Sequence, residues 1–311
     1  MLGLVLTSAV AEIAPPDDEH AIRAPLVTRS LFLDGDAIGD HMVVVGERGH
    51  ILVSRDAGAS WTQAEVPTRA TLTGVSLYDL TRGWAVGHDA TILRTRDGGL
   101  TWEIVYAAAE EQRPLLDVWF ESEEHGFAVG AYGYLLETRD AGDTWQPRHI
   151  SDDDFHLNQI AAAPSGRLYI AGESGTLYRS DDNGANWKKL PSPYKGSFFG
   201  TLPLDHQRVY AYGLRGHLFR SDDAGETWSP VGTRSENLLT KGMKLDGSGV
   251  LFTGMGGTLL IGKHDKQNLR AYQRPDRQGV AGALDAGDGA LVIFGEFGVE
   301  RTSRAELESL Q

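Results

Sequence analysis

Short segments in which apolar and polar residues alternate recur along the whole chain, and this period of two predicts β-strands. Residues 73–78, 83–87, 91–95 and 102–106 show the pattern, and short turns separate these segments. Four strands of this length, joined by tight turns, form one antiparallel sheet. A helical pattern occurs only at residues 304–310, where Ser303 is a suitable N-cap.

The four-strand unit repeats along the chain. A glycine that follows an apolar or small residue marks each unit and recurs at nearly constant intervals, at Gly46, Gly87, Gly130, Gly172, Gly213, Gly254 and Gly295. A period near 40 made of short strands is typical of a β-propeller. We therefore predict an all-β, seven-bladed β-propeller of four-stranded antiparallel blades over residues 20–303, with a short C-terminal helix or tail over 304–311.

The last unit provides only three strands before the chain ends. In the repeat alignment, residues 20–24 fall where an outer strand belongs. An N-terminal strand in that position would remove an exposed sheet edge and close the ring. We therefore predict that residues 20–24 complete blade 7.

Five units carry an eight-residue turn of the form Ser/Thr-x-Asp-x-Gly-x-x-Trp. The Asp can accept hydrogen bonds from the backbone of its own turn, the Gly can adopt a positive φ, and the Trp opens the outer strand and packs between neighbouring sheets. These roles predict a structural staple instead of a ligand or calcium site. The residues concerned are Asp56, Trp61, Asp97, Trp102, Asp140, Trp145, Asp182, Trp187, Asp223 and Trp228.

Composition excludes several classes of function. The formal net charge of −14 disfavours nucleic acid as a partner, because phosphates demand a basic surface. The chain has no cysteine, which excludes disulfides and cysteine-based metal sites. The histidines show no ligand spacing, so we predict neither a metal nor a cofactor.

The first residues are apolar and small, and Ala9-Val10-Ala11 has the form of a signal-peptidase site. We interpret residues 1–11 as a signal-peptide remnant and 12–19 as an acidic linker, and an ordinary first β-strand is the alternative. The sequence has no apolar run long enough to span a membrane.

These eight-residue turns, here called the boxed turns, resemble the Asp-box (BNR) repeats of sialidases and related propellers. The longer patterns from Gly83 to Trp102 and from His125 to Trp145 more closely resemble the photosystem II assembly and stability factor family. The similarity extends over about residues 20–303. It implies a non-enzymatic scaffold that acts outside the cytoplasm, in the periplasm or the thylakoid lumen, and helps a membrane-protein complex to assemble.

One basic or imidazole side chain recurs in each loop that joins an outer strand to the next inner strand. These residues are Arg29, Arg69, Arg113, His156, Lys195, Lys241 and Arg277. All but Lys241 lie at nearly the same interval before the marker glycine, and Lys241 lies closer to it. The neighbouring loops add Arg48, Tyr132 and Arg215. If the loops converge, they form a cationic ring that attracts a carboxylate, a phosphate or an acidic segment of the partner. The alternative is that these are solvated loop residues.

A carbohydrate-active or carbohydrate-binding propeller is the other hypothesis for function. Ile22-Arg23-Ala24-Pro25 partly matches the segment around the first arginine of sialidases, and Arg23, Tyr132 and Glu173 form a candidate set. Loops this short provide few residues that could enclose a sugar in a pocket. We therefore favour the non-enzymatic scaffold.

Overall fold

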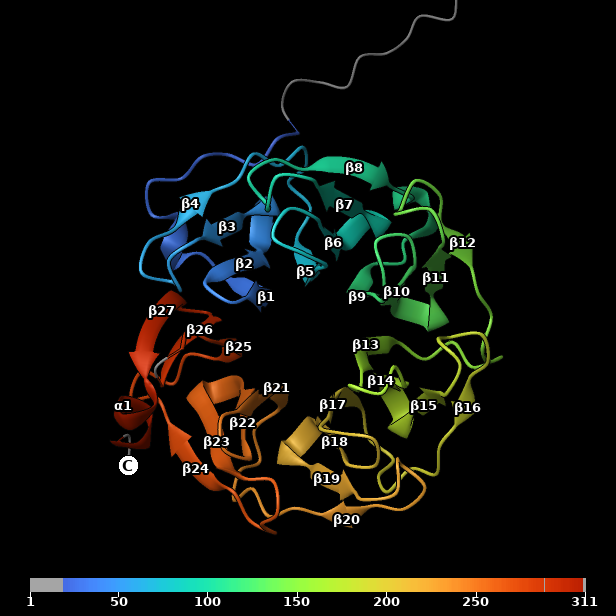
Figure 1. Ribbon diagram of the computed structural model, residues 1–311, viewed down its shortest axis with the longest axis vertical. Coiled ribbons are helices and arrows are strands. Elements are labelled where there is room, and N and C mark those ends of the chain that lie inside the picture. Colours follow the sequence, from blue (N-terminus) through green and yellow to red (C-terminus); the bar gives the residue numbers. More distant parts are fainter. Residues whose placement is uncertain (1–18, 288, 310–311) are drawn as a thin grey trace, which may run out of the picture.

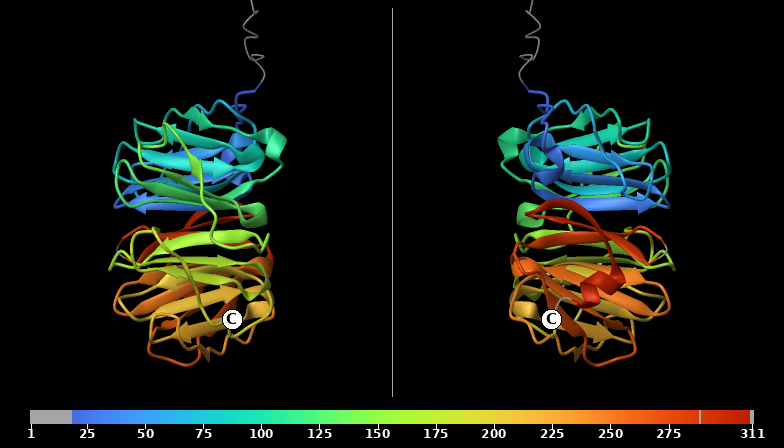
Figure 2. Two further views of the ribbon diagram at one scale, coloured as in Figure 1. Left: turned by 90° about the vertical axis from the view of Figure 1, so that its right-hand side faces the viewer. Right: turned by 90° about the vertical axis from the view of Figure 1, so that its left-hand side faces the viewer.

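The computed structural model describes residues 19–287 and 289–309, and within them seven antiparallel sheets stand as blades around a central channel (Figure 1). The predicted signal-peptide remnant and almost all of the predicted linker lie outside the described residues. Figure 2 shows the ring edge-on, with loops covering two opposite faces. The predicted seven-bladed propeller is confirmed.

Each blade runs from an inner strand at the channel to an outer strand at the rim. The inner strands are β1 (Phe32–Ile38), β5 (Leu72–Leu77), β9 (Leu115–Phe120), β13 (Leu157–Ala162), β17 (Phe198–Pro203), β21 (Leu239–Leu245) and β25 (Val280–Asp285). The second strands are β2 (His41–Gly46), β6 (Gly83–Gly87), β10 (Gly126–Gly130), β14 (Leu168–Gly172), β18 (Val209–Gly213), β22 (Gly249–Gly254) and β26 (Ala290–Gly295). The third strands are β3 (Ile51–Ser54), β7 (Ile92–Thr95), β11 (Leu135–Thr138), β15 (Leu177–Ser180), β19 (Leu218–Ser221), β23 (Thr258–Lys263) and β27 (Gly298–Ser303). The outer strands are β4 (Thr62–Gln63), β8 (Glu103–Tyr106), β12 (Gln146–Pro147), β16 (Lys188–Lys189), β20 (Ser229–Pro230) and β24 (Arg270–Gln273).

The hydrophobic core lies between the blades. Each pair of neighbouring blades shares one cluster of buried apolar side chains, and the last cluster joins blade 7 to blade 1. The second strands are buried along their whole length, because both faces of each sheet are covered. Burial of both sheet faces explains why the second strands are apolar on both sides.

The marker glycines end the second strands, where the chain turns very close to the loop that precedes the inner strand of the same blade. The residue after the glycine donates its backbone N–H to that loop, as His88 does to Thr71 O at 2.9 Å. A Cβ on Gly87 would lie 2.2 Å from the same Thr71 oxygen. Glycine recurs at this position because a side chain would collide with backbone.

Gly87→Ala is therefore expected to lower the free energy of unfolding by about 3 kcal/mol, through overpacking and loss of the His88–Thr71 hydrogen bond. Chemical denaturation followed by tryptophan fluorescence measures the change. Gly39→Ala is the control, because no atom lies within 4 Å of a Cβ there and only its positive φ of 60° disfavours alanine. That control should cost about 1 kcal/mol, and equal losses would contradict the steric explanation.

The prediction that residues 20–24 complete blade 7 is wrong. In the described chain the seventh sheet has three strands, β25 to β27, and residues 20–24 lie along blade 1. Ala21 donates its N–H to Val66 O at 2.9 Å, and the Gln63 side chain bonds to the backbone of both Ile22 and Ala24. These contacts hold the segment beside β4.

The ring closes by packing of blade 1 on blade 7. The short 3₁₀ helix η1 (Val27–Arg29) packs against β27, and Val27 joins the apolar cluster between the two blades. The Arg301 Nε of β27 also donates to Ala57 O at 3.1 Å. Side-chain packing therefore closes the ring in place of the strand exchange that the sequence predicted.

The C-terminal helix α1 (Arg304–Ser309) begins where the sequence indicated, and residue 310 lies outside the described chain. Glu306 N–H donates to Ser303 Oγ at 3.1 Å, and Ser303 N–H donates to the Glu306 carboxylate at 2.8 Å. This is a capping box. Leu307 anchors the helix in the cluster between blades 6 and 7. Among the described residues, no helix has the length and apolar character needed to cross a bilayer.

Candidate binding site

The boxed turns use their polar side chains internally. In blade 1, Asp56 accepts a hydrogen bond from Ser60 N at 2.9 Å and two more from the hydroxyls of Ser54 and Ser60, and Ser54 Oγ in turn accepts from Gly58 N. The hydrogen bonds from Ser60 and Ser54 lower the pKa of Asp56 to about 2. The boxes at Asp97, Asp140, Asp182 and Asp223 have the same pattern.

The tryptophans of the boxes pack at the blade junctions to different extents. Trp102 and Trp145 are buried, whereas Trp61, Trp187 and Trp228 are half-buried against the neighbouring blade. In the described part of the chain, no group of three or more His, Asp or Glu side chains is arranged to hold a metal ion. The hydrogen bonds and packing account for the repeated residues of the box.

The face opposite the boxes, here called the loop face, carries the other two sets of loops. They are the loops from each outer strand to the next inner strand and the turns from each second strand to its third strand. The tip residues Arg48, Asp89, Tyr132, Ser174 and Arg215 have φ between 53° and 59°, and all five are exposed. Tyr132 is 54% exposed.

The predicted cations do not form a uniform ring on this face. Exposed cations gather over blades 5, 6, 7 and 1, in what we call the basic arc: Arg29, Arg48, Arg69, Lys195, Arg215, Arg234 and Arg277. Exposed carboxylates predominate over blades 2 to 4: Asp89, Glu110, Glu111, Asp152, Asp153 and Asp154. The loop face is therefore electrostatically two-sided.

Several carboxylates near the basic arc are tied to neighbouring groups. Glu47 accepts from Leu31 N at 3.2 Å and Glu296 from Gly279 N at 2.6 Å, while Glu65 pairs with Arg23 at 2.9 Å. Glu173 of blade 4 occupies the position equivalent to Glu47 and Glu296, and it accepts from His156 N at 3.1 Å. Glutamate directly after the marker glycine thus fastens the preceding loop, a role that the repeat alignment could have revealed.

The remaining predicted site residues have local partners. Arg113 lies over the Tyr134 ring, with 5.5 Å between guanidinium and ring centroid, and 4.0 Å from Glu111. Arg69 donates to His20 O at 2.9 Å and so helps to hold the N-terminal segment. His156 packs edge-on against Tyr132 and lies 3.7 Å from Glu173.

The sialidase-like set is not assembled. Arg23 pairs with Glu65 at the outer edge of blade 1, whereas Tyr132 and Glu173 both contact His156 at the junction of blades 3 and 4. Figure 1 places these two regions on different sides of the ring. The geometry provides no shared pocket in which the three residues could act on one sugar.

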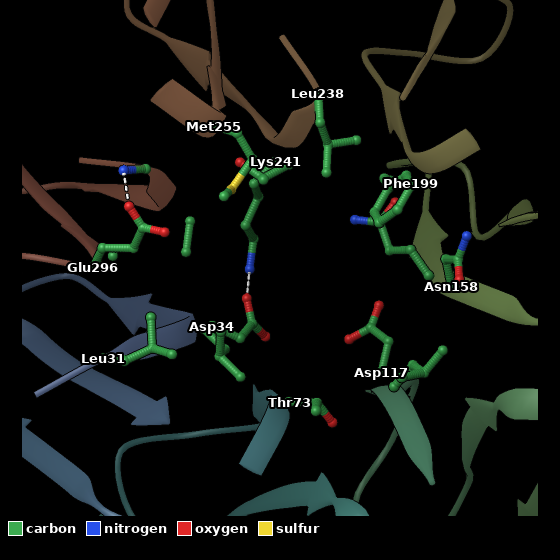
Figure 3. A pocket seen from close by; sticks show the side chains of 17 residues that line it. Leu31, Asp34, Thr73, Asp117, Asn158, Phe199, Leu238, Lys241, Met255 and Glu296 are labelled. Atoms are coloured by element: carbon green, nitrogen blue, oxygen red, sulfur yellow. Dashed lines mark hydrogen bonds and ion pairs between the residues drawn. The ribbon is translucent and has the colours of Figure 1, made fainter. Parts of the chain in front are cut away.

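The prediction that Lys241 lies in a loop is wrong. Lys241 lies within β21, and its side chain extends into the channel, where it forms an ion pair with Asp34 of β1 (Figure 3). Its strand position matches that of Asp34, Asp117 and Gln159, because each pairs with the residue directly before a marker glycine. The glycines at the same position in the other blades leave room for these long side chains.

The channel residues also join neighbouring blades. Asp34 accepts from Val75 N at 3.0 Å, Asp117 accepts from Ile160 N at 3.0 Å, and Gln159 accepts from Thr201 N at 2.6 Å. On the loop-face side of this polar layer lies a cavity of about 430 Å³. Sequence reasoning missed the layer, although its members all lie at nearly the same interval before a marker glycine.

The fold and the boxed turns define a seven-bladed propeller of the Asp-box type. The chain belongs to the family described as photosynthesis system II assembly factor YCF48, whose model matches residues 53–114 and 107–230. A curated relative, the photosystem II assembly protein Ycf48 of Thermosynechococcus vestitus, is 42% identical over 131 residues. That match covers 42% of this chain and 38% of the relative, so the chain spans about two fifths of the relative's length.

Solved structures share the fold at low sequence identity. YCF48 bound to a D1 peptide has a TM-score of 0.71 at 18% identity, over 92% of this chain and 94% of the other. An ancestral GH74 enzyme has a TM-score of 0.71 at 13% identity, over 89% of this chain and 45% of that one. At identities this low, a structural match supports a shared fold and nothing more. The similarity to the GH74 enzyme is therefore no evidence that this chain acts on carbohydrate.

Proposed function

We propose that this protein is a non-enzymatic scaffold that helps a membrane-protein complex to assemble by holding a segment of one subunit on the loop face. Membership in the YCF48 family is the observation that carries this proposal. A family structure described as bound to a D1 peptide is the precedent for docking of a peptide segment. The apolar and small character of residues 1–11 favours export to the periplasm, or to the thylakoid lumen in a photosynthetic host.

The basic arc is the surface we assign to docking. Its cations are exposed, they extend over four consecutive blades, and much of the nearby negative charge is held in hydrogen bonds or ion pairs. A protein with a net charge of −14 repels acidic segments elsewhere on its surface, so the arc is where carboxylates of a partner are attracted. An extended segment is long enough to follow several blades.

Affinity purification from gently solubilised membranes of the host, after fractionation of the cells, tests the proposal. The wild-type protein should capture one membrane complex, and the triple variant Arg48→Glu/Arg215→Glu/Arg277→Glu should capture at least about tenfold less, since reversed charges repel acidic segments. The matched control Arg96→Glu/Lys263→Glu/Lys266→Glu makes the same charge change on exposed cations of the opposite face. Full capture by the first variant, or equal loss in both, would remove the basic arc from the docking model.

A further inference from the structure

The cavity at the loop-face end of the channel combines apolar walls with a charged floor. Leu31, Phe199, Leu238 and Met255 line it near the loop face (Figure 3). Met255 is 40% exposed, so the cavity opens to solvent beside this side chain. The volume of about 430 Å³ is that of a site for a small ligand or for one long side chain.

The floor is richer in carboxylates than in cations. Asp34 and Asp117 face each other across the channel, Asp36 lies farther along it, and Lys241 is the cation of this group. The Lys241 ammonium is directed to β1, where it donates to the Asp34 carboxylate and to Gly35 O at 3.2 Å. Because the floor holds more carboxyl groups than cations, it can compensate the charge of a second cation more readily than that of an anion.

Within the described chain, no ion pair compensates the Asp117 carboxylate. Among the described residues its hydrogen-bond donors are backbone groups, Ile160 N at 3.0 Å and Val118 N at 2.9 Å. Burial raises the pKa of Asp117, and the nearby Asp34 carboxylate raises it further, while Lys241 opposes the shift. A cation at this position would favour the ionised carboxylate.

A buried polar group next to the cavity lining lacks a hydrogen-bond partner in the described part of the chain. Tyr212 is fully buried, and its hydroxyl has no hydrogen-bond partner among the described residues. A Cβ built on Gly200 would lie 2.2 Å from this hydroxyl and 2.5 Å from Gln159 Oε1, so the hydroxyl adjoins a residue that lines the cavity.

We propose that this cavity binds an aliphatic ammonium group, with the methylene chain against the apolar walls and the charge against the Asp117 carboxylate. The walls remove the chain from water, and the carboxylate provides a charge-assisted hydrogen bond at the end of the cavity. A free aliphatic amine and the lysine side chain of a docked segment share this chemistry.

Titration of the full protein with n-hexylammonium, followed by calorimetry or NMR, tests the site. Asp117→Asn should bind this probe about tenfold more weakly, because the variant keeps the shape of the side chain and its acceptor for Ile160 but lacks the charge. Asp152→Asn is the matched control: it removes the same charge from a fully exposed side chain on the loop face and should bind as the wild type does. n-Hexanol, which has the same chain length without charge, should also bind about tenfold more weakly.

Wild-type affinity in Asp117→Asn, or an equal loss in Asp152→Asn, would overturn the proposal. Met255→Trp provides a second variant in case Asp117→Asn does not fold. It narrows the exposed mouth without touching the floor, and it should weaken n-hexylammonium binding. Unchanged binding by this variant would place the amine elsewhere and would also overturn the proposal.

The source of the ammonium group is decided by a second experiment. If Asp117→Asn captures less of the membrane complex and n-hexylammonium displaces the complex from the wild-type protein, the occupant is a lysine side chain of the docked segment. If capture is unaffected by both, the occupant is a free amine. Only this step rests on the proposed scaffold function, because binding of n-hexylammonium is measured without a partner.

Discussion

Trp84→Ala is expected to lower the free energy of unfolding by about 4 kcal/mol. Trp84 lies on β6, is 1% exposed, and stacks on Phe120 of blade 3 with an interplanar angle of 7°. Its Nε1 donates to Ala141 O at 3.1 Å, within the boxed turn of blade 3. The substitution leaves a large cavity between two blades and removes one of the two donors to this oxygen, the other being Arg94 Nη1 at 2.9 Å.

Chemical denaturation followed by circular dichroism measures this loss. Trp187→Ala is the matched control, because the same side chain is removed from a position where it is only half-buried. The control should cost about 2 kcal/mol, because Trp187 buries less apolar surface in the folded protein than Trp84 does. Similar losses in both variants would show that the contribution of a tryptophan to the stability of the propeller does not depend on its burial at the blade junction.

Lys241→Met is expected to lower the free energy of unfolding by about 3 kcal/mol, because it leaves the Asp34 carboxylate without its cation. Asp34 is 10% exposed at the side chain and Lys241 27%, so water in the channel screens the remaining charge only in part. Burial opposes charging of Lys241, but Asp34 and Asp117 raise its pKa above the usual value, which keeps the lysine charged at neutral pH.

The double variant Asp34→Asn/Lys241→Met tests whether the ion pair itself is responsible. Removal of both charges should recover most of the stability lost in Lys241→Met, because no uncompensated charge remains in the channel. Denaturation of the two single variants and the double variant completes the cycle. If the losses in free energy of unfolding of the two single variants simply add in the double variant, Lys241 stabilises the ring through its aliphatic chain and not through Asp34.

The distance in sequence between Lys241 and its marker glycine already separates it from the other residues of the predicted ring. The other members of the predicted ring lie farther before their marker glycines than Lys241 lies before Gly254. That difference moves the side chain from a loop to an inner strand, and hence from the surface to the channel. Asp117 and Gln159 lie at the same interval before their own marker glycines as Lys241 does, so the same register identifies the polar layer.

Local signals determined the blades. The marker glycines, the alternating strands and the boxed turns act within one repeat, where backbone collisions and short-range hydrogen bonds leave few alternatives. Seven blades, their order and the capping box of α1 follow from residues close together in the chain.

Only the tertiary structure decided how the repeats differ around the ring. The path of residues 20–24 depends on contacts with Gln63 and Val66, and the division of the loop face into a basic arc and an acidic side depends on which blades become neighbours. The pairing of Lys241 with Asp34, which are far apart in the sequence, arises because the ring brings blade 6 close to blade 1 across the channel. Such contacts depend on closure of the whole ring, and no repeat by itself contains them.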